Sequence, residues 1–193
     1  TFLNEVKGYI EGDGTPRFSP FFIPKMISDI AAGHISMKYG LTGPNFSTVS
    51  ACASSSHSII DATNYIRLGK ADVFVTGGSE AAINEAGMGG FNAMQAISVN
   101  NDEYKTASRP FDKTRDGFVM GEGGGSLILE ELEHAKKRNA KIYGEVLGGG
   151  MSADAFHLTA PHPEGKGAKH VMINALEDAQ LNPQDIDYIN VHG

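Results

Sequence analysis

The sequence predicts an α/β fold, in which short buried strands alternate with helices along the chain. Two apolar runs, 71–78 and 123–130, are bordered by glycines and have the composition of strands that are covered on both faces. Segments between the predicted strands place apolar or small residues three or four positions apart, which is the helical spacing. Glycine supplies 24 of the 193 residues, well above the usual share of roughly 7 %, so many tight turns are expected.

In the first part of the chain we predict two helices and two strands. Residues 20–40 have apolar positions at helical spacing and end at Gly40, which favours one long helix. The short segment 46–50 is β-prone, and helical spacing resumes at Cys52 and continues to Gly69. With the strand at 71–78, this gives the strand, helix and strand of a parallel sheet.

The second part of the chain continues the alternation. A helix near 84–97 and a polar loop from 98 to 116 precede the strand at 123–130. The remaining predicted elements are a helix at 131–139, a strand at 141–149, a helix at 167–180 and a strand at 186–192.

Composition narrows the classes of partner and compartment. The chain has 16 Lys and Arg against 23 Asp and Glu, for a net charge of −7, with no basic block, so nucleic acid is a poor partner. No apolar run approaches the roughly 20 residues of a membrane helix. The single cysteine excludes an internal disulfide, and the first residues lack a signal-peptide pattern, which favours the cytoplasm. Thr1 in place of Met, and an apolar run just before Gly193, indicate a fragment cut from a longer chain.

The only thiol of the chain, Cys52, falls between a predicted strand and the first turn of a predicted helix. Helix N-termini have unpaired amides and a positive dipole end, which stabilise a thiolate. Small neighbours leave room for a substrate carbonyl, and the amide of Cys52 could donate to an oxyanion. Packing as a small apolar residue is the open alternative. His57 is five residues further on and turned by about 140°, so we expect a structural role for it.

A second candidate, His192, follows the last predicted strand. Ligands of α/β sheets gather at the carboxyl ends of strands, so His192 can face the same crevice as Cys52. A satisfied core histidine is the alternative. The charged loop 108–119 is expected to be an ion-pair network that holds the backbone. No zinc-type cluster and no GxxxxGK[ST] loop occur, so neither a metal nor a nucleotide is expected.

Eight segments, in order along nearly the whole chain, then point to one family. They are Phe21–Pro24, 49–60, Val75–Glu80, Gly89–Phe91, Ser108–Asp112, Arg115–Val119, Gly121–Gly123 and Asn190–Gly193. Together they resemble the elongating β-ketoacyl-[acyl-carrier-protein] synthases of the synthase II type, within the thiolase-like superfamily. The resemblance implies part of a layered α-β-α-β-α fold that is truncated at both ends. Residues 1–140 would be the remainder of the N-terminal half, and 141–193 the start of the C-terminal half.

The same resemblance assigns roles to five residues. Cys52 is implied as the nucleophile that accepts an acyl chain, and His192 as the first of two active-site histidines. Phe91 is implied to line the acyl tunnel near a dimer interface, although ordinary core packing would look alike. Thr159 matches a position near the phosphopantetheine arm. Arg17 matches a basic position where acyl-carrier protein docks, while a lone surface arginine is more often only solvated.

The implied reaction is a decarboxylative Claisen condensation of malonyl-carrier protein with a cysteine-bound acyl chain in fatty-acid elongation. It needs no cofactor beyond the phosphopantetheine of the carrier protein, and the enzyme is expected to be a homodimer. A second histidine, a lysine and a glycine-rich loop of the family would lie beyond Gly193, so the fragment alone is expected to be inactive. Alternatives are a polyketide ketosynthase, a thiolase or initiating synthase of the same superfamily, and a non-catalytic chain-length subunit, against which Cys52 argues.

Overall fold

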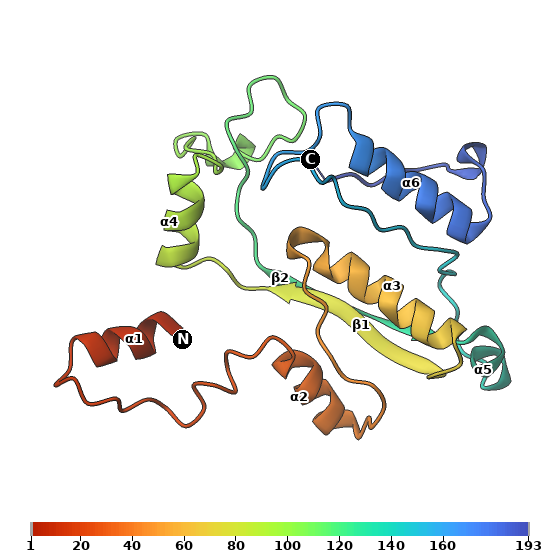
Figure 1. Ribbon diagram of the computed structural model, residues 1–193, viewed down its shortest axis with the longest axis horizontal. Helices are drawn as coiled ribbons and strands as arrows, with labels where there is room; N and C mark the ends of the chain where they lie inside the picture. Colours follow the sequence, from red (N-terminus) through yellow and green to blue (C-terminus); the bar gives the residue numbers. More distant parts are fainter. Residues whose placement is uncertain (1, 193) are drawn as a thin grey trace. The chain divides into compact units, whose positions relative to one another are not determined.

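The computed structural model describes residues 2–192, and its contacts group into two compact units, Thr1–Ala51 and Cys52–Gly193 (Figure 1). The boundary between them falls directly before the candidate nucleophile, Cys52.

The first unit contains α1 (Phe2–Ile10) and α2 (Ile30–Tyr39). The long helix predicted for 20–40 forms only over its second half, and hydrogen-bonded turns replace its first half. Pro20 and Pro24 explain the difference, because a proline lacks an amide donor and disfavours helical backbone in the residue before it. Gly40 ends α2 in the left-handed conformation, with φ 66°. None of residues 2–51 is buried.

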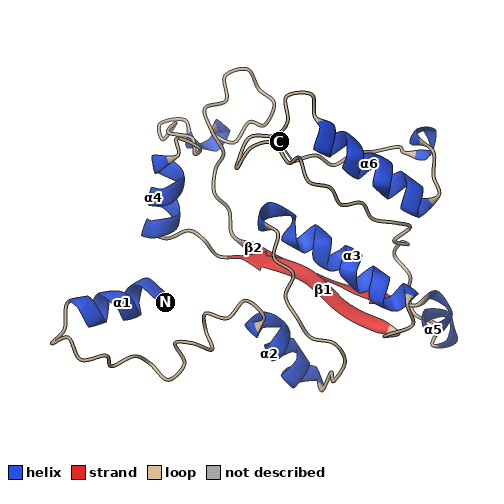
Figure 2. Ribbon diagram, in the orientation of Figure 1, coloured by secondary structure: helices blue, strands red, loops and turns tan. Residues whose placement is uncertain are grey.

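The second unit is built on a sheet of two strands, β1 (Val73–Glu80) and β2 (Gly123–Glu130), with α3 (Ser54–Arg67) packed on it (Figure 2). Both strands were predicted. Their pairing is antiparallel, in a register that runs from Val73 opposite Glu130 to Glu80 opposite Gly123. The predicted parallel unit is wrong, because 46–50 forms no strand and so gives β1 no parallel neighbour among the described residues.

The other described elements of this unit are helices. They are η1 (Ala51–Ala53), which spans the boundary, α4 (Glu85–Ala93), η2 (Tyr104–Thr106), α5 (Leu132–Lys137), α6 (Lys166–Ala179) and η3 (Pro183–Asp185). The predicted helices near 84–97, 131–139 and 167–180 correspond to α4, α5 and α6. The strands predicted at 141–149 and 186–192 are wrong, because neither segment pairs with a strand within residues 2–192. A strand needs a neighbour for its backbone donors and acceptors, and a local pattern cannot supply one.

Small side chains let α3 approach β1 closely. Thr76, only 8 % exposed, donates from its hydroxyl to Ser58 Oγ over 3.1 Å, and Ser58 Oγ donates to the carbonyl of Gly77 over 2.8 Å. A Cβ added at Gly78 would lie 1.8 Å from Ser55 Oγ. The start of α3, which follows Cys52, is thereby held against the strand.

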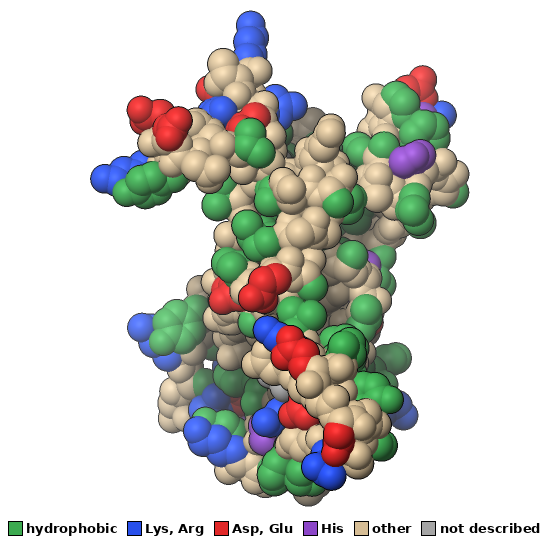
Figure 3. Space-filling view, turned by 90° about the vertical axis from the view of Figure 1, so that its left-hand side faces the viewer, with side chains coloured by type: hydrophobic (Ala, Val, Ile, Leu, Met, Phe, Trp, Pro, Cys, Tyr) green, Lys and Arg blue, Asp and Glu red, His purple; other side chains and the backbone are tan. Residues whose placement is uncertain are grey.

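Much apolar surface stays uncovered. The buried hydrophobic residues among those described are three alanines, Ala62, Ala107 and Ala135. On β2, Leu127 is 50 % and Ile128 is 61 % exposed. Figure 3 shows apolar side chains, in green, along the visible face. Surfaces of this kind mark places where proteins contact other protein.

A charged cluster joins the end of β2 to α5. The Glu130 carboxylate accepts hydrogen bonds from Arg138 Nε at 2.7 Å and Arg138 Nη2 at 2.5 Å, and its Oε1 lies 2.5 Å from His134 Nδ1. The hydrogen bonds from Arg138, and then the one with His134, lower the pKa of Glu130 to about 2. The folded protein therefore favours the ionised carboxylate.

This cluster predicts an acid-dependent loss of stability. The folded pKa of Glu130 lies below its ordinary value of 4.5, so its contribution is fully present above that value and is lost as the pH falls toward about 2. Denaturant unfolding of the full-length protein between pH 7 and pH 2.5 should show a smaller pH-dependent loss for Glu130→Gln than for wild type. Glu133→Gln is the matched control, because Glu133 forms an exposed pair with Lys136. Equal acid sensitivity of Glu130→Gln and wild type would contradict this account.

Candidate active site

Cys52 lies in η1, directly before α3, and its side chain is exposed. The residue before it, Ala51, has φ 50°, in the left-handed region that costs energy for a residue with a Cβ. Strained backbone of this kind clusters at functional sites, where the rest of the fold maintains it. The chain thus turns sharply at the thiol and leaves it open to a substrate.

The first turn of α3 adds donors near this thiol. Its N-cap residue, Ala53, makes no side-chain capping hydrogen bond, and the first amides of a helix have no partner within the helix. These amides and the dipole of the helix favour negative charge close to its start. A thiolate or an oxyanion at Cys52 would benefit from both.

His192 is exposed and follows η3, whose start is fixed by reciprocal hydrogen bonds between Asn182 and Asp185. Within residues 2–192, no hydrogen bond joins the Cys52 thiol to the His192 imidazole. The pairing of these two groups in one cavity therefore stays a prediction.

The charged loop forms the predicted network. Arg109 donates to the carbonyls of Thr106 and Thr114 and to Asp116 Oδ1, the last over 3.2 Å. Asp116 also accepts from Ser98 Oγ at 2.7 Å and from an amide, and the hydrogen bond from Ser98 is the main cause that lowers its pKa. The carboxylate and guanidinium groups are thus used to hold backbone.

Phe91 lies on α4, half-buried, and its ring meets that of Phe118 edge to face, with 5.2 Å between ring centroids. Phe118 lies near the end of the charged loop 108–119, so the network above also places the ring that contacts Phe91. A lining of the acyl tunnel and ordinary packing both fit this contact, and the role of Phe91 stays a prediction.

Thr159 lies in an exposed loop whose backbone is shaped by a histidine that the sequence analysis missed. His157 Nδ1 accepts from the amides of Thr159, at 3.1 Å, and Ala160, at 3.0 Å. An imidazole two residues before the candidate residue is the signal that could have identified it. The role of Thr159 itself stays a prediction.

Arg17, in the first unit, pairs with Asp13 over 3.4 Å, and both side chains are mostly exposed. Such a pair contributes little to stability and leaves Arg17 on the surface. The role of Arg17 in docking a carrier protein stays a prediction.

Comparison with known proteins decides the family. Residues 5–135 match the model of the β-ketoacyl synthase N-terminal domain, and residues 143–193 match that of the β-ketoacyl synthase C-terminal domain. The chain belongs to the β-ketoacyl synthase family.

Curated relatives of the chain agree with this family. It is 54 % identical over 177 residues to the mitochondrial 3-oxoacyl-[acyl-carrier-protein] synthase of Arabidopsis thaliana, covering 91 % of this chain and 38 % of the relative. It is 53 % identical over 188 residues to 3-oxoacyl-[acyl-carrier-protein] synthase 2 of Rhizobium meliloti, covering 96 % and 45 %. The chain therefore spans less than half the length of these relatives.

Solved structures confirm the predicted thiolase-like fold. A β-ketoacyl synthase from Burkholderia phymatum matches with a TM-score of 0.90 at 36 % identity, covering 99 % of this chain and 46 % of that one. A ketosynthase in complex with its type II polyketide acyl-carrier protein also matches with a TM-score of 0.90, at 33 % identity over 97 % of this chain and 46 % of that one.

Within residues 2–192 no group of three or more His, Cys, Asp or Glu side chains is placed to hold a metal ion. In the part of the chain that the structure describes, none of the helices combines the length and the apolar character that a membrane crossing needs.

Proposed function

We propose that the whole protein is a 3-oxoacyl-[acyl-carrier-protein] synthase, which condenses malonyl-carrier protein with a Cys52-bound acyl chain in fatty-acid elongation. One observation carries the proposal: in a member of the β-ketoacyl synthase family, the single cysteine lies exposed at a strained turn just before α3. The names of relatives that are 54 % and 53 % identical in sequence to this chain support the same reaction.

In the first step, the Cys52 thiolate attacks the carbonyl carbon of the acyl thioester. The tetrahedral oxygen becomes an anion, and main-chain amides at the turn, including that of Cys52, donate hydrogen bonds to it. The C–S bond to phosphopantetheine then breaks, and the carrier protein leaves with its thiol. The acyl chain remains as a thioester on Cys52.

In the second step, malonyl-carrier protein enters and loses carbon dioxide. A neutral His192 imidazole donates a hydrogen bond to the malonyl thioester carbonyl and stabilises the enolate that forms. The enolate carbon attacks the acyl carbonyl, and the bond to the Cys52 sulfur breaks. The product is a 3-oxoacyl thioester that is two carbons longer than the original acyl chain. The release of carbon dioxide supplies the driving force.

The proposal also assigns roles to three further residues and to the two parts of the chain. Phe91 lines the acyl pocket, Thr159 binds the phosphopantetheine arm, and Arg17 contacts an acidic acyl-carrier protein. Residues 1–140 and 141–193 are parts of the two halves of the whole enzyme. Neither a metal nor an organic cofactor takes part.

Assembly and compartment complete the proposal, and each has its own measurement. We propose a homodimer, which light scattering of the full-length protein tests. We propose the cytoplasm as the compartment, and cell fractionation tests it against mitochondria, where the names of two relatives place those proteins.

A single reaction tests the proposed chemistry. The full-length protein is given acyl-carrier protein loaded with an eight-carbon chain and malonyl-carrier protein labelled with ¹³C at the free carboxyl. The expected products are one equivalent of ¹³CO₂ and a ten-carbon 3-oxoacyl chain on the carrier. No release of ¹³CO₂ and no longer chain would remove the proposal.

The polyketide reading has its own support in the neighbour that is a type II polyketide ketosynthase. The same assay separates the two functions. A fatty-acid synthase makes one extension per acyl chain when no reductase is present, whereas a polyketide ketosynthase continues to extend the unreduced 3-oxo chain.

A further inference from the structure

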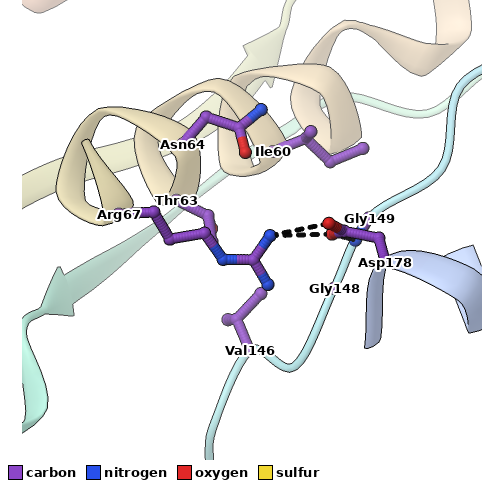
Figure 4. Close-up of a pocket in the computed structure, with 8 residues that line it drawn as sticks. All are labelled: Ile60, Thr63, Asn64, Arg67, Val146, Gly148, Gly149 and Asp178. Atoms are coloured by element: carbon purple, nitrogen blue, oxygen red, sulfur yellow. Dashed lines mark hydrogen bonds and ion pairs between the residues drawn. The ribbon is translucent and has the colours of Figure 1, made fainter. Parts of the chain in front are cut away.

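An ion pair joins the last residue of α3 to α6. Arg67 Nη1 donates to Asp178 Oδ1 at 2.9 Å and to Oδ2 at 2.8 Å (Figure 4). The two residues are 111 positions apart in the sequence. Their side chains are 38 % and 39 % exposed, so the pair itself contributes little to the free energy of folding.

Both partners of the ion pair also bind the segment that runs between the two helices. Arg67 Nη2 donates to the carbonyl of Leu147 at 2.6 Å, and Asp178 Oδ2 accepts from the amide of Gly149 at 2.8 Å. The amide of Gly149, and then Arg67, lower the pKa of Asp178. A guanidinium serves this arrangement because its planar fork reaches two acceptors at fixed angles.

The segment between the helices has no spare room. A Cβ added at Gly148 would lie 2.6 Å from the amide nitrogen of Ala179, in α6, and one at Gly149 would lie 2.5 Å from Ile60 Cγ1, in α3. A Cβ at Gly150 would lie 2.2 Å from a carbonyl oxygen of α6, that of Val171. The backbone of 148–150 therefore touches both helices, and the ion pair closes across it.

This arrangement lies between the two candidate catalytic residues in the chain. Cys52 lies in η1, which leads directly into α3. At the other end of the arrangement, α6 leads through η3 to His192. We infer that the Arg67–Asp178 ion pair, with its bonds to Leu147 and Gly149, is a positioning device that fixes α3, which follows Cys52, relative to α6, which leads toward His192. The inference rests on the proposed function, and it makes Arg67 and Asp178 positioning residues, because neither touches the reacting atoms.

The two half-reactions distinguish positioning from stability. Acylation needs Cys52 but not His192, whereas condensation needs both groups in register. In the full-length protein, Arg67→Met should lower the condensation rate of the pre-acylated enzyme by about 10-fold to 100-fold, the cost of a displacement of roughly 1 Å. The rate of Cys52 acylation should change less than about twofold on the same argument. Arg67→Lys, which keeps the charge, should recover part of the lost condensation.

Arg138→Met is the matched control. It breaks an arginine–carboxylate pair of similar geometry, with Glu130, that does not join α3 to α6. The variant should leave the ratio of condensation to acylation as in wild type. Should Arg67→Met fail to fold, Asp178→Asn makes the same test, because its amide oxygen still accepts from Gly149.

The outcomes separate the inference from the proposed function. Wild-type protein that forms no 3-oxoacyl product overturns the proposed function and the inference with it. Active wild type, with a folded Arg67→Met variant whose two rates are unchanged or fall equally, overturns the inference alone. A selective loss of condensation, partly restored by Arg67→Lys, supports it.

Discussion

Replacing Cys52 by alanine should reduce condensation by the full-length protein at least about 1,000-fold, because the covalent acyl intermediate cannot form without the thiol. The measurement is the rate at which malonyl-carrier protein and acyl-carrier protein yield 3-oxoacyl product. Thermal unfolding should stay close to wild type, since the removed sulfur is exposed and exposed substitutions change stability little.

Ser56→Ala is the matched control for this variant. Ser56 is exposed and lies four residues beyond Cys52, in α3. It should keep wild-type activity. A Cys52→Ala protein that retains a tenth of the wild-type rate would show that another group carries the acyl chain.

The second large effect is on stability, at Gly77→Ala. Gly77 has φ 148°, and a Cβ there would lie 2.1 Å from the carbonyl oxygen of Gly125 and 2.8 Å from the Cα of Ser126. Both obstacles are backbone of β2, so the two strands would have to separate. Alanine rarely adopts this φ, so the variant is strained, and it also loses contact between β1 and β2. Together these effects predict a loss of about 3 kcal/mol or more in the free energy of unfolding.

Gly125→Ala is the control for this prediction, because Gly125 lies in the same sheet and nothing is within 4 Å of its added Cβ. It should cost no more than about 1 kcal/mol. Chemical denaturation of the full-length proteins measures both values. Equal stability of the two variants would show that the close approach of β1 and β2 at Gly77 does not matter.

The helices from α3 to α6 and the two paired strands could be predicted because their signals are local, whereas α1 was not predicted. The apolar runs at 71–78 and 123–130 became β1 and β2, and helical spacing located α6. Strands at 46–50, 141–149 and 186–192 could not be judged locally, since a strand exists only when a distant segment pairs with it. Spacing also overextended the helix at 20–40, where prolines override the apolar pattern.

Some features of the candidate site could likewise be predicted from the sequence, and others could not. A thiol before a helix could be predicted from small residues around Cys52, but the left-handed backbone of Ala51 could not, because alanine normally avoids it. The Arg67–Asp178 pair has no local signal at all, since its partners are brought together by the fold. His157 is intermediate, because its bond to the Thr159 amide is local but no common motif marks it.

The most direct test of the central claim is peptide mapping by mass spectrometry after the full-length protein is incubated with an acyl-carrier protein thioester. The account predicts one acyl group per chain, attached to the sulfur of Cys52, and its loss when malonyl-carrier protein is added. An unmodified Cys52, or an acyl group on any other residue, would contradict it.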